Sequence, residues 1–303
     1  MLQISIIEKI KKYLKNPSIL FYILEVKVVR LFYELLNLHP ISDLFISGDT
    51  IKNISTYEYK GGALRLKKPE IIFTNTHFLS KFLRQLKSVK YSFILITHHS
   101  DCNVDEKFLS IVNNKKLIHW YAQNCLLKHK KISNFPIGLE DRWRHNNGII
   151  QDFIKLRKKK VNKISRILYG FSVSTNIMVR KPAQQTLGKL SITDYYYETS
   201  RVYRKKLINY MFVACPEGNG IDTHRFWEAL YLNVIPVTTN KNFYSQFENL
   251  PILAINKWAD LGSYSEDDLN SFYQKNKHKF KLIQYIWMNY WKKHIKTKIK
   301  KYK

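Results

Sequence analysis

The sequence predicts an α/β protein with two Rossmann-like units that face each other across a cleft. From Pro69 onward, short apolar runs alternate with helical stretches, a pattern typical of mostly parallel, doubly wound sheets. A second series of the same kind begins near Ile167, after a lysine-rich stretch. A chain of 303 residues is long enough for two such units, each with its own core.

The first unit is expected to span residues 1–160 and to begin with helices. The apolar stretch 19–38 contains Glu25, Lys27, Arg30 and Glu34, which indicates an amphipathic helix and not a membrane span. A polar, irregular stretch containing Gly61 and Gly62 follows. The later pattern then predicts strands at 71–73, 93–96, 116–124 and within 131–140, and helices at 78–89 and 105–113.

The second unit is expected to span residues 161–274. A helix at 151–163 leads into it, and a later helix begins near Lys181, with Pro182 in its first turn. The sequence SEDDL predicts a capped helix start at Ser265. The remaining elements are strands at 167–171, 210–215, 234–238 and 251–255, and a helix at 223–232.

Residues 275–303 are expected to form a basic amphipathic helix. This stretch contains eleven lysines, interleaved at helical spacing with Phe280, Ile283, Trp287, Trp291 and Ile295. We expect it to pack across the first unit with its lysines in solvent. Direct contact with an anionic membrane is the alternative.

The composition is that of a folded protein, with a large excess of positive charge. With 45% hydrophobic residues and no low-complexity tract, extensive disorder is excluded. The net charge of +28 favours anionic partners, although the abundance of Lys, Asn, Ile, Tyr and Phe also fits AT-rich codon usage. Cys102, Cys125 and Cys215 show no metal-binding spacing. Together with the absence of a cleavable signal sequence, this predicts a cytoplasmic protein, with peripheral membrane association as a further possibility.

The segment Phe212–Thr239, FVACPEGNGIDTHRFWEALYLNVIPVTT, carries the strongest chemical signal. Its glycine loop lets backbone amides approach a ligand, and Asp222 or Thr223 caps the following helix, whose N-terminus attracts anions. Arg225 in the first turn suits phosphate oxygens, and Glu228 suits the two hydroxyls of a ribose. The alternative is a simple ion pair between Arg225 and Glu228 on a solvated helix. The predicted site for a nucleoside diphosphate comprises Gly218, Asn219, Gly220, Thr223, Arg225 and Glu228.

Two other strand ends supply candidate site residues. After the strand at 167–171, Ser174, Asn176 and Arg180 are candidates for further diphosphate contacts, or for an ordinary helix cap. In the first unit, the titratable groups that could act as a catalytic base are His98, His99 and Asp101. Residues expected to line the same cleft are Asn75, His77, Gln123 and Asn124. Glu140 and Asp141 are expected to cap the next helix, and contact with acceptor hydroxyls is the alternative.

The segment 212–239 resembles the signature of exostosin-like glycosyltransferases of GT-B fold. The shared pattern is a strand, P-x-G-x-G, R-x-x-E-A-L and a strand with I-P-V, and fucosyltransferase-like enzymes have a related helix. The resemblance extends weakly to residues 171–182 and 250–261. In the first unit, the phrases ITHHSD, WYAQN and FPIGLE, at 96–101, 120–124 and 135–140, are similar to those of bacterial relatives. Glu217 departs from the family, which often has a basic residue there.

The resemblance implies a sugar transferase, with a nucleotide-sugar donor in the second unit and a glycan or lipid-linked acceptor in the first. It implies a role in cell-surface polysaccharide synthesis. No cofactor is expected besides the nucleotide-diphosphate sugar that serves as substrate. No metal is expected, because the chain has no D-x-D pair. The alternatives are a basic nucleic-acid-binding protein, which lacks a recognisable motif here, and an inactive relative that acts as a scaffold.

Overall fold

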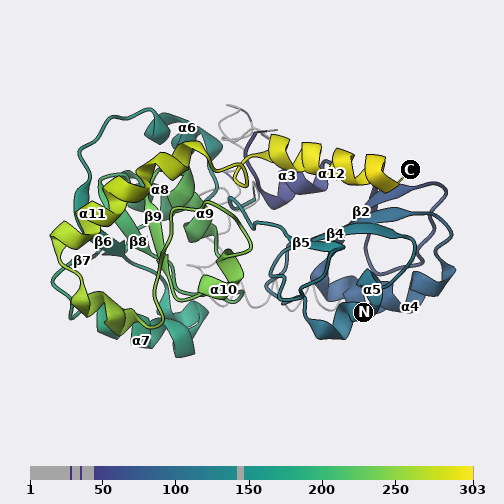
Figure 1. Cartoon of the computed structure of the whole chain (residues 1–303), viewed down its shortest axis with the longest axis horizontal. Coiled ribbons are helices and arrows are strands. Elements are labelled where there is room, and N and C mark those ends of the chain that lie inside the picture. The colour runs from purple at the N-terminus through teal and green to yellow at the C-terminus, as the bar shows by residue number, and fades with distance from the viewer. Residues whose placement is uncertain (1–27, 29–34, 36–43, 142–146, 303) are drawn as a thin grey trace.

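The protein contains two five-stranded parallel sheets, as Figure 1 shows. The computed structural model describes residues 44–141 and 147–302, together with Val28 and Leu35. The helices expected in residues 1–38 lie outside the described residues. The first sheet has the order β1-β2-β3-β4-β5, with β1 at Tyr57–Tyr59, β2 at Glu70–Asn75, β3 at Phe93–His98, β4 at Leu117–Ala122 and β5 at Ile132–Asn134. The mixed α/β class and the parallel pairing are therefore confirmed.

Each face of the first sheet is covered by a different set of helices. One face packs Ile72, Leu95 and Trp120 against the helices that connect the strands. Connections between parallel strands in sequential order place their helices on the same side of the sheet, so the other face needs cover from elsewhere in the chain. The connecting helices are η1 (Thr76–Phe78), α4 (Leu79–Gln85), η2 (Leu86–Ser88), η3 (Glu106–Phe108) and α5 (Leu109–Val112).

The opposite face of the first sheet is covered by the C-terminal helix α12 (Met288–Tyr302), which lies along this sheet in Figure 1. Trp291 packs on Tyr121 and Phe135, and the Tyr121 hydroxyl lies 2.8 Å from His294 Nδ1. The expected packing across the first unit is thus confirmed. The single helix expected over 275–303 is not, because η7 (Lys277–Lys281) is separated from α12.

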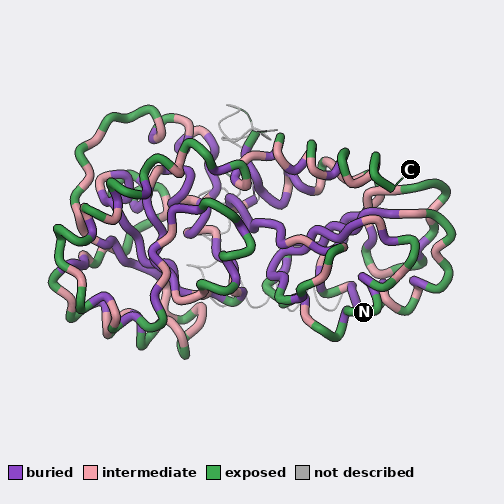
Figure 2. The backbone as a smooth tube through the Cα atoms, in the orientation of Figure 1, coloured by how far each residue is buried: buried purple, intermediate pink, exposed green. Residues whose placement is uncertain are grey.

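The second sheet has the order β10-β9-β8-β6-β7, in which the strand order reverses between β6 and β8. Its core continues into that of the first sheet through α9 (His224–Tyr231). Figure 2 shows buried backbone in both halves of the molecule. Helices cover both faces, as in a doubly wound sheet. The strands are β6 (Ile164–Tyr169), β7 (Thr193–Tyr195), β8 (Tyr210–Ala214), β9 (Ile235–Thr238) and β10 (Leu253–Ala254).

Several predicted helices have other bounds in the structure. The helix predicted near Lys181 begins at Ile177, because the Asn176 side chain accepts a hydrogen bond from Val179 N, and Pro182 therefore lies inside it. The capping box at Ser265 is confirmed. The remaining helices are α3 (Gly48–Lys52), α6 (Ile150–Arg157), α7 (Ile177–Leu187), α8 (Ser200–Leu207), α10 (Lys241–Tyr244), α11 (Glu266–Asn276), η5 (Val173–Thr175) and η6 (Trp258–Ser263).

None of the helices in the described part of the chain is both long and apolar enough to cross a membrane. The cysteines Cys102, Cys125 and Cys215 are all free thiols.

Candidate active site

The glycine loop after β8 forms one wall of a cavity at the carboxyl ends of the second sheet. Gly218 N donates to Gly220 O over 3.1 Å, which closes the loop into a tight turn. A Cβ at Gly220 would lie 2.8 Å from Asn124 Nδ2, and a Cβ at Gly218 would lie 3.1 Å from an Arg180 nitrogen. A side chain at Gly220 would therefore displace Asn124, and one at Gly218 would press on the end of the Arg180 side chain. The loop lies where the strand order reverses between β6 and β8, the position at which open α/β sheets bind ligands.

Two arginines converge on this loop. Arg180 on α7 donates to Glu217 O over 2.7 Å and to Ser172 O over 2.9 Å. Arg225 in the first turn of α9 donates to Gly170 O and, over 3.1 Å, to the Tyr203 hydroxyl. Backbone carbonyls and a hydroxyl thus hold both guanidinium groups, and neither has a carboxylate partner among the described residues. Burial and the charge of Arg225 lower the pKa of Arg180 to about 10. The pair is an arrangement suited to a multivalent anion.

Glu228 and Thr223 complete this side of the cavity. Within residues 44–141 and 147–302, the Glu228 carboxylate has no hydrogen-bond or ion-pair partner, so the alternative pairing with Arg225 is not formed. Thr223 is the N-cap residue of α9, yet its side chain makes no capping bond, and its buried hydroxyl has no partner among the described residues. The cap expected from Asp222 or Thr223 is therefore not a side-chain cap.

The cavity itself measures about 470 Å³ and combines residues from both sheets. A volume of this size accommodates a nucleotide-sized ligand. The lining residues are Asp101, Ile137, Glu140, Asn147, Thr175, Arg180, Ser200, Gly218, Asn219, Gly220, Asp222, Thr223, His224, Arg225 and Glu228. We refer to it below as the arginine cavity.

The buried carboxylate of Asp222 ties the arginine cavity to the first sheet. It accepts hydrogen bonds from Ile137 N over 2.8 Å, from Trp227 Nε1 over 2.7 Å and from the Tyr244 hydroxyl over 3.1 Å. Burial is the largest influence on this group and raises the pKa of Asp222 to about 6. Asp222 therefore holds the start of α9 against the loop after β5.

A second cavity, of about 410 Å³, adjoins the first at the carboxyl ends of β2, β3 and β4. We call it the histidine cavity. It shares the residues Asp101, Ile137, Glu140 and His224 with the arginine cavity. Its other lining residues are Gly48, Asn75, His77, His98, His99, Ser100, Gln123 and Asp141. A ligand in one cavity would therefore lie next to a ligand in the other.

His99 and Asp141 form a hydrogen-bonded pair in the histidine cavity. His99 Nε2 lies 2.9 Å from Asp141 Oδ2, and the other carboxylate oxygen accepts from Asp49 N over 3.0 Å. Burial opposes ionisation of Asp141, but the bond to His99 and its charge outweigh it and lower the pKa of Asp141. The ionised carboxylate holds Nε2 and so orients the His99 ring, which leaves Nδ1 as the nitrogen that is not bonded to Asp141. The start of α6 has no side-chain cap, and the residues that directly follow Asp141 lie outside the described ranges.

His98, by contrast, is held in the core. Its Nε2 lies 3.2 Å from Pro136 O, and its buried Nδ1 has no partner among the described residues. Burial lowers the pKa of His98, so this ring is neutral at physiological pH. Of the three base candidates, only His99 has a carboxylate partner in the described part of the chain, and Asp101 lies where the two cavities meet.

His224 and Glu140 lie at the junction of the two cavities. His224 Nδ1 is 2.8 Å from Gly138 O, and its Nε2 is 3.4 Å from Glu140 Oε1. Burial alone would lower the pKa of His224, but the charge and hydrogen bond of Glu140 raise it to about 9. The imidazole is thus protonated at neutral pH and adds a third cation beside Arg225 and Arg180.

Other predicted residues occupy supporting positions. Asn124, expected to line the cleft, is buried and instead bridges Ser100 O and Asp222 N, each over 3.0 Å. Asn176 caps α7 and donates to Gly218 O over 2.8 Å, so it supports the loop from outside the cavity. Ser174 bonds Ser172 on the exposed surface, and its neighbour Thr175 lines the cavity in its place. Asn75, His77 and Gln123 do line the histidine cavity.

Several lining residues were not predicted from the sequence. Asn147 and Ser200, which line the arginine cavity, form a hydrogen bond of 2.6 Å with each other. His224 also lines this cavity and lies within the segment 212–239, but it was not among the predicted site residues. The H-R pair at the start of α9 is the signal that could have identified His224. The described residues contain no cluster of three or more His, Cys, Asp or Glu side chains that could hold a metal ion.

Comparison with models of known protein families gives no match, and no curated protein matches the chain.

Proposed function

We propose that this protein is a metal-independent glycosyltransferase with the GT-B arrangement, which moves a sugar from a nucleoside diphosphate to a hydroxyl group of a glycan or lipid-linked acceptor. The observation that carries the proposal is the set of unpaired charges in the arginine cavity. Among the described residues, Arg180 and Arg225 have no carboxylate partner and Glu228 has no cationic one, although all three line the same space. Two cations and one carboxylate beside a glycine loop match a diphosphate and a ribose diol.

The proposed reaction uses the two adjoining cavities for the two substrates. The donor occupies the arginine cavity, with its diphosphate at Arg180, Arg225 and the amides at the start of α9, and its ribose hydroxyls at Glu228. The acceptor hydroxyl enters the histidine cavity and gives its proton to His99 Nδ1, while Asp141 stabilises the imidazolium that forms. The acceptor oxygen bonds to the anomeric carbon as the bond to the diphosphate breaks, and the diphosphate leaves with that electron pair. Attack opposite the leaving group inverts the anomeric centre.

The donor half is tested by binding, without knowledge of the acceptor. A thermal-shift screen of nucleoside-diphosphate sugars against the full chain identifies the donor, because a ligand that binds the folded state raises its melting temperature. Calorimetry then compares the wild type with Arg225→Ala. Loss of a charge-assisted bond of about 1.5–3 kcal/mol weakens binding about 10- to 100-fold. The matched control is Lys181→Ala, an exposed cation next to Arg180 on the same helix, which should bind like the wild type.

The role of Glu228 has a sharper test. Glu228→Gln should weaken the ribonucleotide donor and have little effect on the 2′-deoxyribose analogue, because the interaction with that hydroxyl is already missing. If no nucleoside-diphosphate sugar binds, or if Arg225→Ala and Glu228→Gln bind donors as Lys181→Ala does, the proposed function is wrong. His99→Ala separates the two halves of the proposal, since it should abolish transfer while leaving the donor affinity unchanged.

A further inference from the structure

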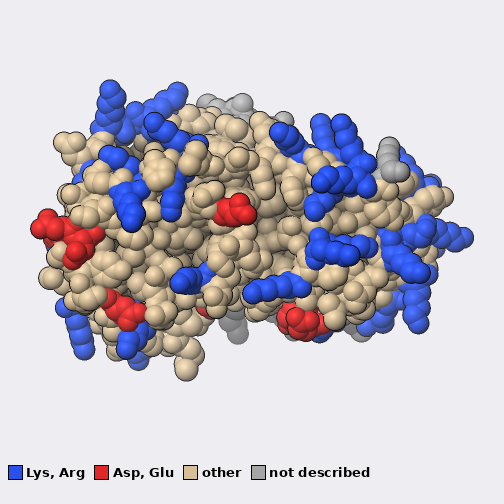
Figure 3. All heavy atoms as spheres, in the orientation of Figure 1, with Lys and Arg blue, Asp and Glu red and all other residues tan. Residues whose placement is uncertain are grey.

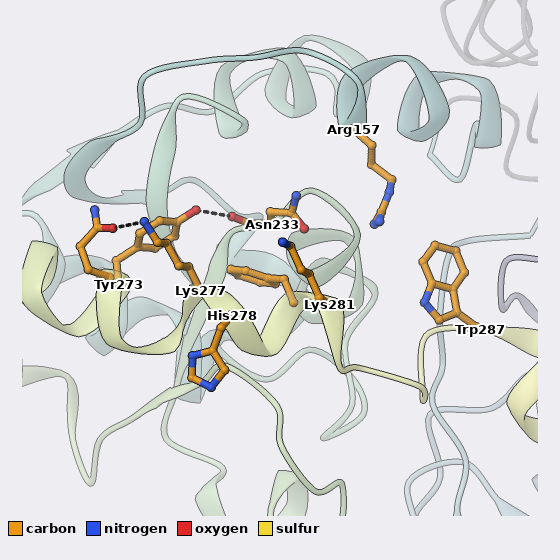
Figure 4. A pocket seen from close by; sticks show the side chains of 9 residues that line it. Arg157, Asn233, Tyr273, Lys277, His278, Lys281 and Trp287 are labelled. Carbon is orange, nitrogen blue, oxygen red and sulfur yellow. Dashed lines mark hydrogen bonds between the residues drawn. The ribbon is translucent and has the colours of Figure 1, made fainter.

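A third cavity lies at the amino ends of the strands of the second sheet, opposite the end that holds the arginine cavity. It measures about 700 Å³ and lies beside Asn233, which is two residues before the start of the buried strand β9. The glycine loop follows its strand, whereas Asn233 comes before one, so the two sites lie at opposite ends of the parallel strands. Figure 4 shows the cavity with Arg157 at the end of α6 and Lys277 and Lys281 on η7.

The charge around this cavity has one sign. Among the described residues, neither this cavity nor the adjoining one of about 410 Å³ is lined by an Asp or a Glu. The adjoining cavity shares Arg157 with it and adds Lys159, Lys160 and Lys163. Like charges brought together without carboxylates repel one another, and an anion relieves that repulsion. Figure 3 shows that Lys and Arg side chains also gather along α12, so the neighbouring surface extends the positive field.

Arg157 is held in place and is not an ordinary solvated side chain. It donates to Tyr231 O over 2.6 Å, and its guanidinium lies 5.0 Å from the centre of the Trp287 ring. This half-buried cation has no carboxylate partner within the described ranges. A single backbone carbonyl uses only part of the five-donor capacity of a guanidinium. The remaining donors are therefore preorganised at the cavity.

Two further cations of the cavity come from η7. Lys277 bonds only the Gln274 side chain, and Lys281 has no hydrogen-bond or ion-pair partner among the described residues. In Figure 4, Lys281 points toward Asn233, whereas His278 points away to the other side of the helix. Tyr273 and Phe280 supply an apolar wall between these cations. The cavity thus combines one fixed guanidinium, two exposed ammonium groups and aromatic surface.

We propose that this cavity, which we call the Arg157 site, binds a phosphate-bearing anion, either a free phosphorylated compound or the headgroup of an anionic lipid. A guanidinium binds two phosphate oxygens in a fixed, planar geometry. A lysine ammonium adds positive charge but does not require one particular orientation of the phosphate. The aromatic wall accepts the organic group attached to the phosphate. This site is independent of the proposed transferase activity, because it shares no lining residue with the arginine or histidine cavity.

The free-phosphate arm of the test uses tripolyphosphate and calorimetry. All proteins in this arm carry Arg225→Ala, which removes the competing phosphate contacts of the arginine cavity. Adding Lys277→Ala and Lys281→Ala should weaken binding at least tenfold at 150 mM salt. The matched control replaces the same number of charges on the exposed face of α12, with Lys296→Ala and Lys300→Ala, and should weaken it less than twofold.

The lipid arm uses sedimentation with vesicles of phosphatidylcholine containing 30% phosphatidylglycerol. If the Lys277→Ala, Lys281→Ala variant no longer sediments with the vesicles while the α12 control still does, the site binds a lipid headgroup. Weakened tripolyphosphate binding with unchanged sedimentation assigns it to a free phosphate compound. If the η7 variant and the α12 control behave alike in both arms, the proposed site is wrong. Donor binding in the otherwise wild-type chain should be unaffected by the η7 changes, so failure here is distinguishable from failure of the proposed function.

Discussion

Replacing Gly48 by alanine should separate His99 from Asp141 without altering the fold. A Cβ at this position would lie 1.8 Å from His99 Nε2, 2.1 Å from His99 Cδ2 and 2.8 Å from Asp141 Oδ1. An ordinary contact needs at least 3.4 Å, so the ring must move by more than 1 Å and its 2.9 Å bond to Asp141 cannot survive. The backbone of Gly48 is not in the left-handed region, so alanine meets only this steric obstacle.

The loss should be visible in the titration of Asp141. His99 lowers the pKa of this carboxyl in the folded state. The pair therefore stabilises the folded protein at pH values above 3.8, the ordinary pKa of the group, and this stabilisation is lost as the pH falls from 3.8 through the folded-state pKa. In Gly48→Ala, the Asp141 pKa should rise toward 3.8. The free energy of unfolding at neutral pH should fall by about 1–3 kcal/mol. Transfer should slow about 100-fold or more, the usual contribution of a general base.

Carboxyl ¹³C NMR of aspartate-labelled protein measures this titration directly, with the Asp141 signal assigned from its absence in Asp141→Asn. The matched control is Gly62→Ala, because a Cβ at Gly62 meets nothing within 4 Å. An Asp141 midpoint in Gly48→Ala that equals those of the wild type and the control would refute the reasoning.

Three further predictions concern charge and packing. Because the pKa of His224 is about 9, donor affinity measured by calorimetry should fall as the pH rises through 9 and stay level in His224→Gln; equal pH profiles would contradict this. Asp152→Ala should reduce the free energy of unfolding in urea by about 3–5 kcal/mol, because it removes the carboxylate 3.0 Å from the fully buried Arg204. The exposed Asp267→Ala is its control, with an expected change within about 0.5 kcal/mol, and equal losses would exclude the mechanism. Trp291→Ala should cost about 3–5 kcal/mol in the same assay if α12 belongs to the core of the first sheet, and a cost below about 1 kcal/mol would show that it does not.

The longer buried strands could be predicted from the sequence because they are continuous apolar runs. β3 and β8, for example, are buried at every position. The short strands β1 and β7 were missed, since YEY and TDY contain no such run and depend on pairing with longer neighbours. The start of α7 was misplaced because Pro182 was taken as a first-turn signal, whereas the capping amide of Asn176 sets the boundary.

The arginine cavity could be predicted in large part because one contiguous segment supplies most of it. Arg225, Glu228 and the glycine loop lie within eleven residues, so local geometry brings them together. The pairing of His99 with Asp141 could not be predicted in this way. It depends on a loop after β5 returning to the end of β3, and on a glycine in α3 that leaves room for the ring. Such contacts follow from the tertiary structure and leave no local pattern.

The position of α12 also affects how the chain reaches its folded state during synthesis. Tyr121 on β4 and His294 on α12, which lie 2.8 Å apart, are separated by 173 positions. While the intervening chain is being made, the face of the first sheet that includes Tyr121 and Phe135 is not yet covered by α12. The nascent first sheet should therefore remain open to chaperones, and to aggregation, until α12 leaves the ribosome. The core of the first sheet is thus completed only after α12 has been synthesised.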